Sequence, residues 1–293
     1  MERLDFPHPR SSYVMLSHKI VLHQFHQVVK MKKWLFLGIA LYSTQLAAFP
    51  RANPVPGGIA VLPVAPLSDK LPIVQYAGKR VTVVPQGDQW QALIGLPLDA
   101  EPGTQRLLVS GKPLEFEIKN KQYRTQRIRI TDPNKVTPDE ESSERIVREL
   151  NIQKQVRSRF SATTQPDLNF IRPVPGRDTG SFGLRRIINE LPRNPHSGMD
   201  IAAPTGTPVK ATAAGRVIHV GDFFFSGNSV YVDHGSGVIS LYAHLSQTRV
   251  KPGDTLLQGD VLGEVGRTGR ATGPHLHWSI YLNGEAVDPA LLL

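Results

Sequence analysis

Apolar and polar residues alternate in short runs along two stretches of this 293-residue chain, and a segment with a helical pattern separates them. Such alternation, with Gly or Pro between the runs, is typical of β-strands that bury one face. Residues 71–135 are therefore predicted to form a small β-sandwich-like domain, and the Pro- and Gly-rich residues 49–70 before it an extended tether. The clearest runs lie at 80–84, 106–110, 114–118 and 127–130.

The segment between the two stretches begins with Thr137-Pro138-Asp139-Glu140. Thr137 can cap a helix, Pro138 suits its first position, and Glu140 completes a capping box. Apolar residues then recur every three or four positions, which predicts a helix over about 138–159. Helix and linker together, residues 136–179, are expected to connect the two β regions.

The second stretch, residues 180–293, again consists of short runs that Gly and Pro separate. This pattern predicts an antiparallel all-β domain, so the chain as a whole is expected to be mainly β. We expect this part to fold by itself from about residue 161. Its runs lie at 209–212, 215–220, 229–233, 238–242, 261–265 and 276–281.

The first 48 residues have the pattern of a targeting segment. The basic Met31-Lys32-Lys33 precedes a short apolar run at 34–41 and small residues that end at Ala48, which are the three parts of a secretory signal. The apolar run is short for a membrane span, so cleavage after Ala48 is expected, with an uncleaved anchor as the alternative. Met31 is then the expected start, and residues 1–30 are an upstream extension.

Charge and composition limit the partners and the kinds of site that the chain can have. The chain carries a formal net charge of +9, of which residues 1–48 account for +4. The remaining surplus fits an anionic polymer such as a cell wall, nucleic acid or an anionic membrane, and it fits equally a solvated face without a partner. No stretch clusters Lys or Arg with aromatic residues, so no nucleic-acid partner is expected. The chain has no Cys, which excludes disulfides, thiolate metal sites and Cys nucleophiles. Any metal must therefore be held by His and carboxylate side chains.

All six histidines after residue 48 fall between positions 196 and 277. His196 and Asp200 are four residues apart, and the Gly and Pro around them favour a strand or loop edge over a helix. His275 and His277 project from one face of a predicted strand, about 7 Å apart. Both can converge on one metal, or one can bind the metal while the other works beside it.

His244 ends an apolar strand, a position where a lone His is usually structural. Two His and one carboxylate around Zn²⁺ leave the fourth tetrahedral position for water, which is the catalytic arrangement. The metal lowers the pKa of that water and polarises the scissile carbonyl. Two further imidazoles can accept the proton and stabilise the oxyanion.

At these residues the sequence resembles the lysostaphin/LytM-type zinc metallopeptidases, which hydrolyse peptidoglycan peptides. The resemblance covers about residues 180–293, and residues 71–135 are similar to the β domain that precedes the peptidase in some Gram-negative members. The motifs that carry the resemblance lie at 196–202, 233–237, 242–245 and 269–278. Together they imply a duplicated-hybrid-motif, lysostaphin-like groove with one Zn²⁺ per chain at its floor.

The resemblance also assigns roles to single residues. It implies that His196, Asp200 and His277 are the metal ligands, and that His244 and His275 are catalytic imidazoles. All five positions of the family pattern are occupied by the expected residue types. No departure suggests an inactive relative.

The resemblance further implies that segments 222–228 and 266–273 form the walls of the groove. Phe223 to Phe225 fit equally well as core or as a rim contact. His219 is expected on an ordinary strand surface, and His234 in a turn or beside the groove.

The function implied is a zinc-dependent endopeptidase that cuts the peptide cross-links of peptidoglycan in the periplasm or cell envelope of a Gram-negative bacterium. Its partners are peptidoglycan stem peptides, with no integral membrane segment after signal cleavage. Two alternatives are a non-enzymatic wall-binding activator of another murein hydrolase and a metallopeptidase for an exported protein. The N-terminal β domain either positions the substrate or covers the groove, and the oligomeric state stays open.

Overall fold

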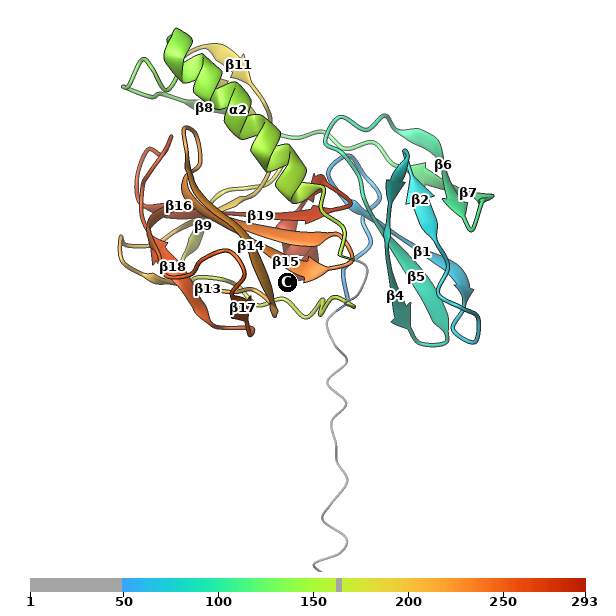
Figure 1. Cartoon of the computed structure of the whole chain (residues 1–293). Helices are drawn as coiled ribbons and strands as arrows, with labels where there is room; N and C mark the ends of the chain where they lie inside the picture. The colour runs from blue at the N-terminus through green and yellow to red at the C-terminus, as the bar shows by residue number, and fades with distance from the viewer. Residues whose placement is uncertain (1–48, 162–164) are drawn as a thin grey trace, which may run out of the picture. The chain divides into compact units, whose positions relative to one another are not determined.

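The computed structural model describes residues 49–161 and 165–293, which form two β regions joined by one helix (Figure 1). In the figure the first region is coloured blue to green and the second yellow to red. The predicted upstream extension and secretory signal, residues 1–48, lie outside the described residues. Within the described part of the chain, no helix is both long and apolar enough to cross a membrane.

The N-terminal region consists of two antiparallel sheets, with strand orders β1-β5-β4 and β3-β2-β6-β7. Apolar side chains of both sheets share one core, as the alternating pattern predicts. The strands are β1 (Ile59–Pro66), β2 (Val74–Tyr76), β3 (Lys79–Arg80), β4 (Thr82–Gln86), β5 (Gln89–Gly95), β6 (Gly103–Val109) and β7 (Lys112–Ile118).

The predicted tether over residues 49–70 is wrong for the segment that forms β1. This strand pairs with β5 along its length, and Ile59 and Ala60 are almost completely buried. Its register shifts between Pro63 and Ala65, so the proline sits at an irregularity, where its missing N–H is tolerated. The prolines therefore mark a bulged strand and not a solvated linker.

The helix α2 (Glu140–Arg157) follows the first region, close to its predicted bounds. The predicted cap, however, is wrong: Asp139 caps the helix, and its carboxylate accepts a hydrogen bond of 2.8 Å from the Ser142 N–H. Helix α2 is tied to the second region by Glu149, whose carboxylate accepts from the Phe224 N–H at 2.7 Å. The helix thus supports the segment around Phe224.

The C-terminal region contains a large antiparallel sheet with the main strand order β17-β14-β15-β16-β19-β12-β9. Strand β18 joins β13 to β16, and β20 pairs with β19. The strands are β9 (Arg177–Gly180), β12 (Met199–Ala202), β13 (Pro208–Lys210), β14 (Gly215–Phe223), β15 (Gly227–Gly235), β16 (Val238–Thr248), β17 (Thr255–Leu256), β18 (Val261–Val265), β19 (His275–Leu282) and β20 (Glu285–Val287), followed by the 3-10 helix η1 (Pro289–Leu292).

A fourth sheet, with the order β11-β10-β8, corrects the predicted domain boundary at residue 135. Strand β8 (Thr125–Ile128) pairs in parallel with β10 (Arg185–Ile188), and β10 pairs with β11 (Leu191–Arg193). The run predicted at 127–130 therefore belongs to a sheet of the second region. Its partner lies 60 residues further along the chain, and alternation alone does not reveal which strand a run pairs with.

The two β regions share buried contacts. Because neighbouring residues of a strand face opposite sides, Ala60 packs into the core of the N-terminal sheets while Ile59 packs into the core of the second region. The Asn283 side chain accepts a hydrogen bond from the Gly95 N–H at 2.8 Å and donates to the Gly95 carbonyl at 3.2 Å. The Thr82 hydroxyl donates to the Ser236 carbonyl at 2.7 Å.

Candidate metal centre and active site

His196, Asp200 and His277 meet at one point of the large sheet. The His196 Nε2 and His277 Nδ1 atoms lie 2.9 Å and 2.8 Å from the same Asp200 oxygen, and 3.0 Å from each other. The structure thus brings together the three residues that were expected to bind metal, one ligand atom from each within 4.8 Å of the others.

Strand register accounts for this convergence. Asp200 on β12 is directly opposite His277 on β19, so both side chains leave the sheet on the same face. His196 precedes β12 and is almost fully buried, and its N–H bonds to the Leu184 carbonyl at 2.9 Å. Gly198 allows the close approach, because a Cβ there would lie 2.6 Å from the Trp278 carbonyl oxygen and 2.7 Å from His277 Cε1.

The donor set fits a divalent cation. The His196 Nδ1–H donates to the Ser181 carbonyl at 2.9 Å, so in the neutral ring the Nε2 lone pair points at the Asp200 carboxylate. Burial lowers the pKa of His277 to about 4, which favours the neutral form of that ring. Its Nε2 lies 2.9 Å from the Ser279 hydroxyl, a partner of the kind that orients metal-binding His. The lone pairs of the two imidazole nitrogens and of the Asp200 oxygen thus face one another, and a cation bound between them stabilises this arrangement.

Arg186 is a site residue that the sequence reasoning missed. Its Nη2 donates to the second Asp200 oxygen at 2.9 Å, and thereby holds the oxygen that the two imidazoles leave free. No motif marks this arginine, which comes from β10 and reaches Asp200 only because the chain folds back. A charge-assisted hydrogen bond of this kind fixes the orientation of the carboxylate.

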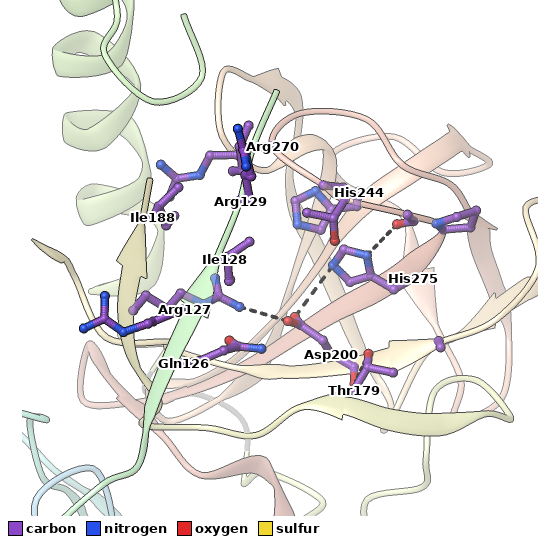
Figure 2. A pocket seen from close by; sticks show the side chains of 17 residues that line it. Gln126, Arg127, Ile128, Arg129, Thr179, Ile188, Asp200, His244, Arg270 and His275 are labelled. Atoms are coloured by element: carbon purple, nitrogen blue, oxygen red, sulfur yellow. Dashed lines mark hydrogen bonds and ion pairs between the residues drawn. The ribbon is translucent and has the colours of Figure 1, made fainter. Parts of the chain in front are cut away.

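His244 and His275 lie beside this cluster, with their ring centroids 4.7 Å apart. Each Nδ1–H donates to a backbone carbonyl at 2.8 Å, that of Thr268 for His244 and that of Gly273 for His275. In the neutral form of each ring, Nε2 is therefore the nitrogen with the lone pair, and His275 Nε2 lies 3.8 Å from Asp200 (Figure 2). Burial lowers the pKa of His244 to about 3.

The backbone of His244 has φ +63°, a left-handed conformation that non-glycine residues rarely adopt. It lies where the register between β15 and β16 shifts, and its N–H donates to the Ser226 carbonyl at 2.8 Å. Strained positions of this kind cluster at functional sites, where the surrounding structure holds them in place.

Asp200, His244 and His275 line a pocket of about 460 Å³ (Figure 2). One predicted wall is present, since residues 270–273 line the pocket. The other predicted wall, residues 222–228, does not line the pocket. The opposite side is formed by residues 126–130, which belong to β8 and the chain after it. The segment 222–228 instead supports the first wall from behind, for example through the Phe225 carbonyl, which accepts from the Arg270 N–H at 2.8 Å.

His219, His234 and the phenylalanines of segment 222–228 do not line the pocket. His219 is half-buried on β14, where its ring stacks near Phe223. His234 is buried in β15, so its predicted place in a turn or beside the groove is wrong; its Nδ1 lies 2.8 Å from the Ala214 carbonyl. Phe223 and Phe224 are buried, so these two residues belong to the core and not to the rim.

Comparisons with known proteins agree with this geometry. The models of two families match the chain: "Peptidase family M23" at residues 194–289 and "Peptidase family M23 N-terminal domain" at residues 52–121. A crystal structure from Pseudomonas aeruginosa, described as an M23 peptidase, is 42% identical and superposes with a TM-score of 0.68. The match covers 82% of this chain and 95% of that one.

Two curated relatives match a shorter part of the chain. "DD-carboxypeptidase/endopeptidase Mpg" of Neisseria meningitidis is 48% identical over 94 residues, which cover 32% of this chain and 22% of that protein. "Peptidoglycan DD-endopeptidase ShyA" of Vibrio cholerae is 40% identical over 113 residues, 38% of this chain and 26% of that protein. The chain thus spans about a quarter of the length of these relatives. Since it covers nearly all of the Pseudomonas structure at 42% identity, the chain belongs to peptidase family M23.

Proposed function

We propose that this protein is a zinc-dependent endopeptidase that hydrolyses the peptide cross-links of bacterial peptidoglycan. The observation that carries the proposal is the convergence of two imidazoles and one carboxylate beside an open pocket, which that carboxylate and two further imidazoles line. The named activities of the Neisseria and Vibrio relatives support the choice of substrate.

In this proposal His196, Asp200 and His277 hold the metal. Two imidazole nitrogens and one carboxylate oxygen form a ligand set of a kind that catalytic zinc sites use, and they leave one position open. When bound, zinc supplies Lewis acidity, which activates water and polarises a carbonyl. Arg186 keeps the Asp200 carboxylate in the orientation that the two imidazoles require.

His244 and His275 move protons. Because both Nδ1 atoms donate to backbone carbonyls, both Nε2 atoms are acceptors at the pocket. One imidazole can therefore take a proton from the attacking water, and the other, once protonated, can donate to the developing oxyanion or the leaving amine. The buried surroundings of His244 favour its neutral form, as a proton acceptor requires.

The direct test is incubation of the zinc-loaded chain 49–293 with purified Gram-negative sacculi, with and without a chelator. We expect chelator-sensitive loss of cross-linked muropeptide dimers, with monomers appearing and glycan strands intact. No release by the wild-type chain would favour a non-enzymatic activator of another murein hydrolase. Cleavage of a Gly-rich protein but not of sacculi would favour an exported protein as substrate.

A variant separates the roles of the histidines. His244→Ala should abolish hydrolysis while zinc stays bound at one ion per chain, because His244 is not one of the three ligands. His219→Ala is the matched control, since it removes a half-buried imidazole from a strand outside the pocket and should leave activity intact. Normal digestion by His244→Ala would show that the assignment of this residue is wrong.

We also propose export to the periplasm or cell envelope, with removal of the residues up to Ala48. The basic, apolar and small-residue segments before Phe49 support this proposal. Sequencing the N-terminus of the protein recovered from the periplasm tests it. A mature chain that begins at Phe49 is the expected result, whereas a membrane-bound chain with the segment intact would indicate an anchor.

A further inference from the structure

The pocket beside the candidate metal centre is strongly cationic. One carboxylate, that of Asp200, faces it among the described residues. Two of its arginines have carboxylate partners: Arg186 binds Asp200, and Arg127 binds Glu190 at 2.5 Å. The arginines that line it are Arg127, Arg129, Arg186 and Arg270.

Among the residues that the structure describes, the other two arginines have no carboxylate partner. Within the described chain, neither Arg129 nor Arg270 has a carboxylate within 4.0 Å. Figure 2 shows both at the same end of the pocket, away from Asp200. They come from opposite walls, Arg129 from the chain after β8 and Arg270 from the loop before β19.

Arg270 is held in place rather than free in solvent. Its guanidinium lies 4.2 Å from the centre of the Phe225 ring, and its Nη1 is 3.5 Å from the Lys135 carbonyl oxygen. Burial, with Arg186 and Arg193 nearby, lowers the pKa of Arg270 to about 10, so the group still carries its charge at neutral pH. A fixed, partly buried cation among other cations is unfavourable until an anion joins it.

A carboxylate on the peptide is the anion that fits. Guanidinium groups bind carboxylates in a planar, two-point geometry, and the occupant of a peptidase pocket is a peptide. In a cross-link made through the side-chain amine of diaminopimelate, the carbon that bears this amine also bears a free carboxylate. Such a substrate would place an anion next to the scissile bond.

We propose that Arg129 and Arg270 form a carboxylate-binding subsite that selects peptides with a free carboxylate near the scissile bond. This inference rests on the proposed function, and it adds two specificity-determining residues to it. The apolar side chains that complete the two walls, Ile128 and Ile130 on one side and Ala271 and Pro274 on the other, leave these guanidinium groups as the charged contacts at that end.

The test compares two cross-linked stem peptides that differ in one group, a free carboxylate or a carboxamide beside the scissile amide. Calorimetry measures their binding to the full chain 49–293 after chelation, so that hydrolysis does not interfere. We expect the wild-type chain to bind the free acid about tenfold more tightly or better, as charge-assisted hydrogen bonds do. Arg270→Gln and Arg129→Gln should each weaken binding of the free acid and leave the carboxamide unchanged.

Two further variants guard against a merely structural effect. Arg270→Lys keeps the charge and should retain part of the preference, while Arg267→Gln removes an exposed arginine of the same loop outside the pocket and should change nothing. Circular dichroism checks that each variant is folded. Arg129→Gln alters an exposed side chain, so it tests the subsite even if the Arg270 variants fold poorly.

Several outcomes would overturn the subsite: equal affinity of the wild-type chain for both peptides, equal loss for both peptides in the Gln variants, or no binding of either peptide at millimolar concentration. The sacculus digestion described above is read separately. Hydrolysis of sacculi without a carboxylate preference would contradict the proposed subsite and would leave the proposed endopeptidase activity supported. A preference for the free acid in binding, without hydrolysis of sacculi, would support the subsite and contradict the endopeptidase activity.

Discussion

Arg186 is the residue whose removal we expect to disturb the metal centre most without touching a ligand. It holds one oxygen of the buried Asp200 carboxylate at 2.9 Å. The charge of Arg186 also repels a bound cation. Loss of Arg186 therefore has two opposing effects on zinc affinity. Partners that orient metal ligands typically contribute ten- to hundredfold in affinity, and we therefore expect orientation to outweigh repulsion.

We predict that Arg186→Met weakens zinc binding by about ten- to hundredfold. Competition with a chromophoric chelator measures this directly, without any substrate. Arg185→Met is the matched control, because it removes an exposed arginine at the adjacent position of β10. Unchanged zinc affinity in Arg186→Met would contradict the prediction that the orienting effect of Arg186 outweighs its repulsion of the cation.

His234 gives a pH dependence that is independent of the metal site. It is buried in β15 between the Ala214 carbonyl and the Ser240 hydroxyl, and burial lowers its pKa below the usual value near 6.5. Below about pH 6.5 the unfolded chain binds a proton that the folded chain excludes. The free energy of unfolding therefore falls as the pH falls, by at most about 1.4 kcal/mol per pH unit from this residue.

We predict that His234→Gln flattens this dependence, because glutamine keeps polar atoms at the position but takes up no proton. Urea unfolding at pH 7, 6 and 5 gives the free energy of unfolding for both chains. The wild-type chain should lose more stability than the variant between pH 6.5 and 5. Parallel curves for the two chains would show that His234 titrates alike when folded and unfolded.

At the scale of elements, the contact between β5 and the turn after β19 joins the two β regions. Asn283 has φ +46°, a conformation that asparagine tolerates better than alanine, and its side chain bonds to both the N–H and the carbonyl of Gly95. Gly95 admits this approach because a Cβ there would lie 2.6 Å from the Leu282 carbonyl oxygen. The turn and the strand end thus satisfy each other's buried polar groups.

We predict that Asn283→Ala lowers the free energy of unfolding by about 2–4 kcal/mol, since it leaves two buried backbone groups without partners and strains the turn. Asn151→Ala, at an exposed position of α2, is the control and should change it by less than about 0.5 kcal/mol. Chemical denaturation of both variants checks the prediction. A loss as small as that of the control would mean that water replaces the amide.

At the scale of the whole molecule, the N-terminal sheet β1-β5-β4 is buried on both faces. Ile59, Val84 and Leu93 pack into the core of the second region, and each fully buried apolar side chain contributes about 1.5–3 kcal/mol. Their sum, about 5–9 kcal/mol, is comparable with the total stability of many domains. This shared core changes the expectation that residues 161–293 fold well by themselves.

We predict that the truncated chain 161–293 unfolds at a markedly lower temperature than the chain 49–293, or does not fold at all, and that it digests sacculi poorly. The truncation also removes residues 126–130, which form one wall of the pocket. Thermal unfolding by circular dichroism, with muropeptide release, measures both effects. A stable truncated chain with raised activity would instead show that the N-terminal part covers the groove.

Local patterns were sufficient for a large share of the fold. Alternation marks most strands of both regions, because a half-buried strand repeats every two residues wherever it pairs. Asp139 shows the limit of such reasoning within one element, since several polar residues before α2 could cap it and the backbone geometry selects one. The mainly β architecture and the family resemblance rest on this local information.

The sequence alone was sufficient to name the three residues that the structure brings together as candidate metal ligands, because His196 and Asp200 are close along the chain and the resemblance supplies His277. The remaining features of the site depend on pairing between segments that are distant along the chain, so they required the folded structure. The parallel pairing of β8 with β10 makes residues 126–130 a wall, and the same folding back carries Arg186 to Asp200. Arg129 and Arg270, 141 positions apart, face one pocket for the same reason. Such contacts depend on which strands meet and in which register, and a periodic pattern carries no information about its partner.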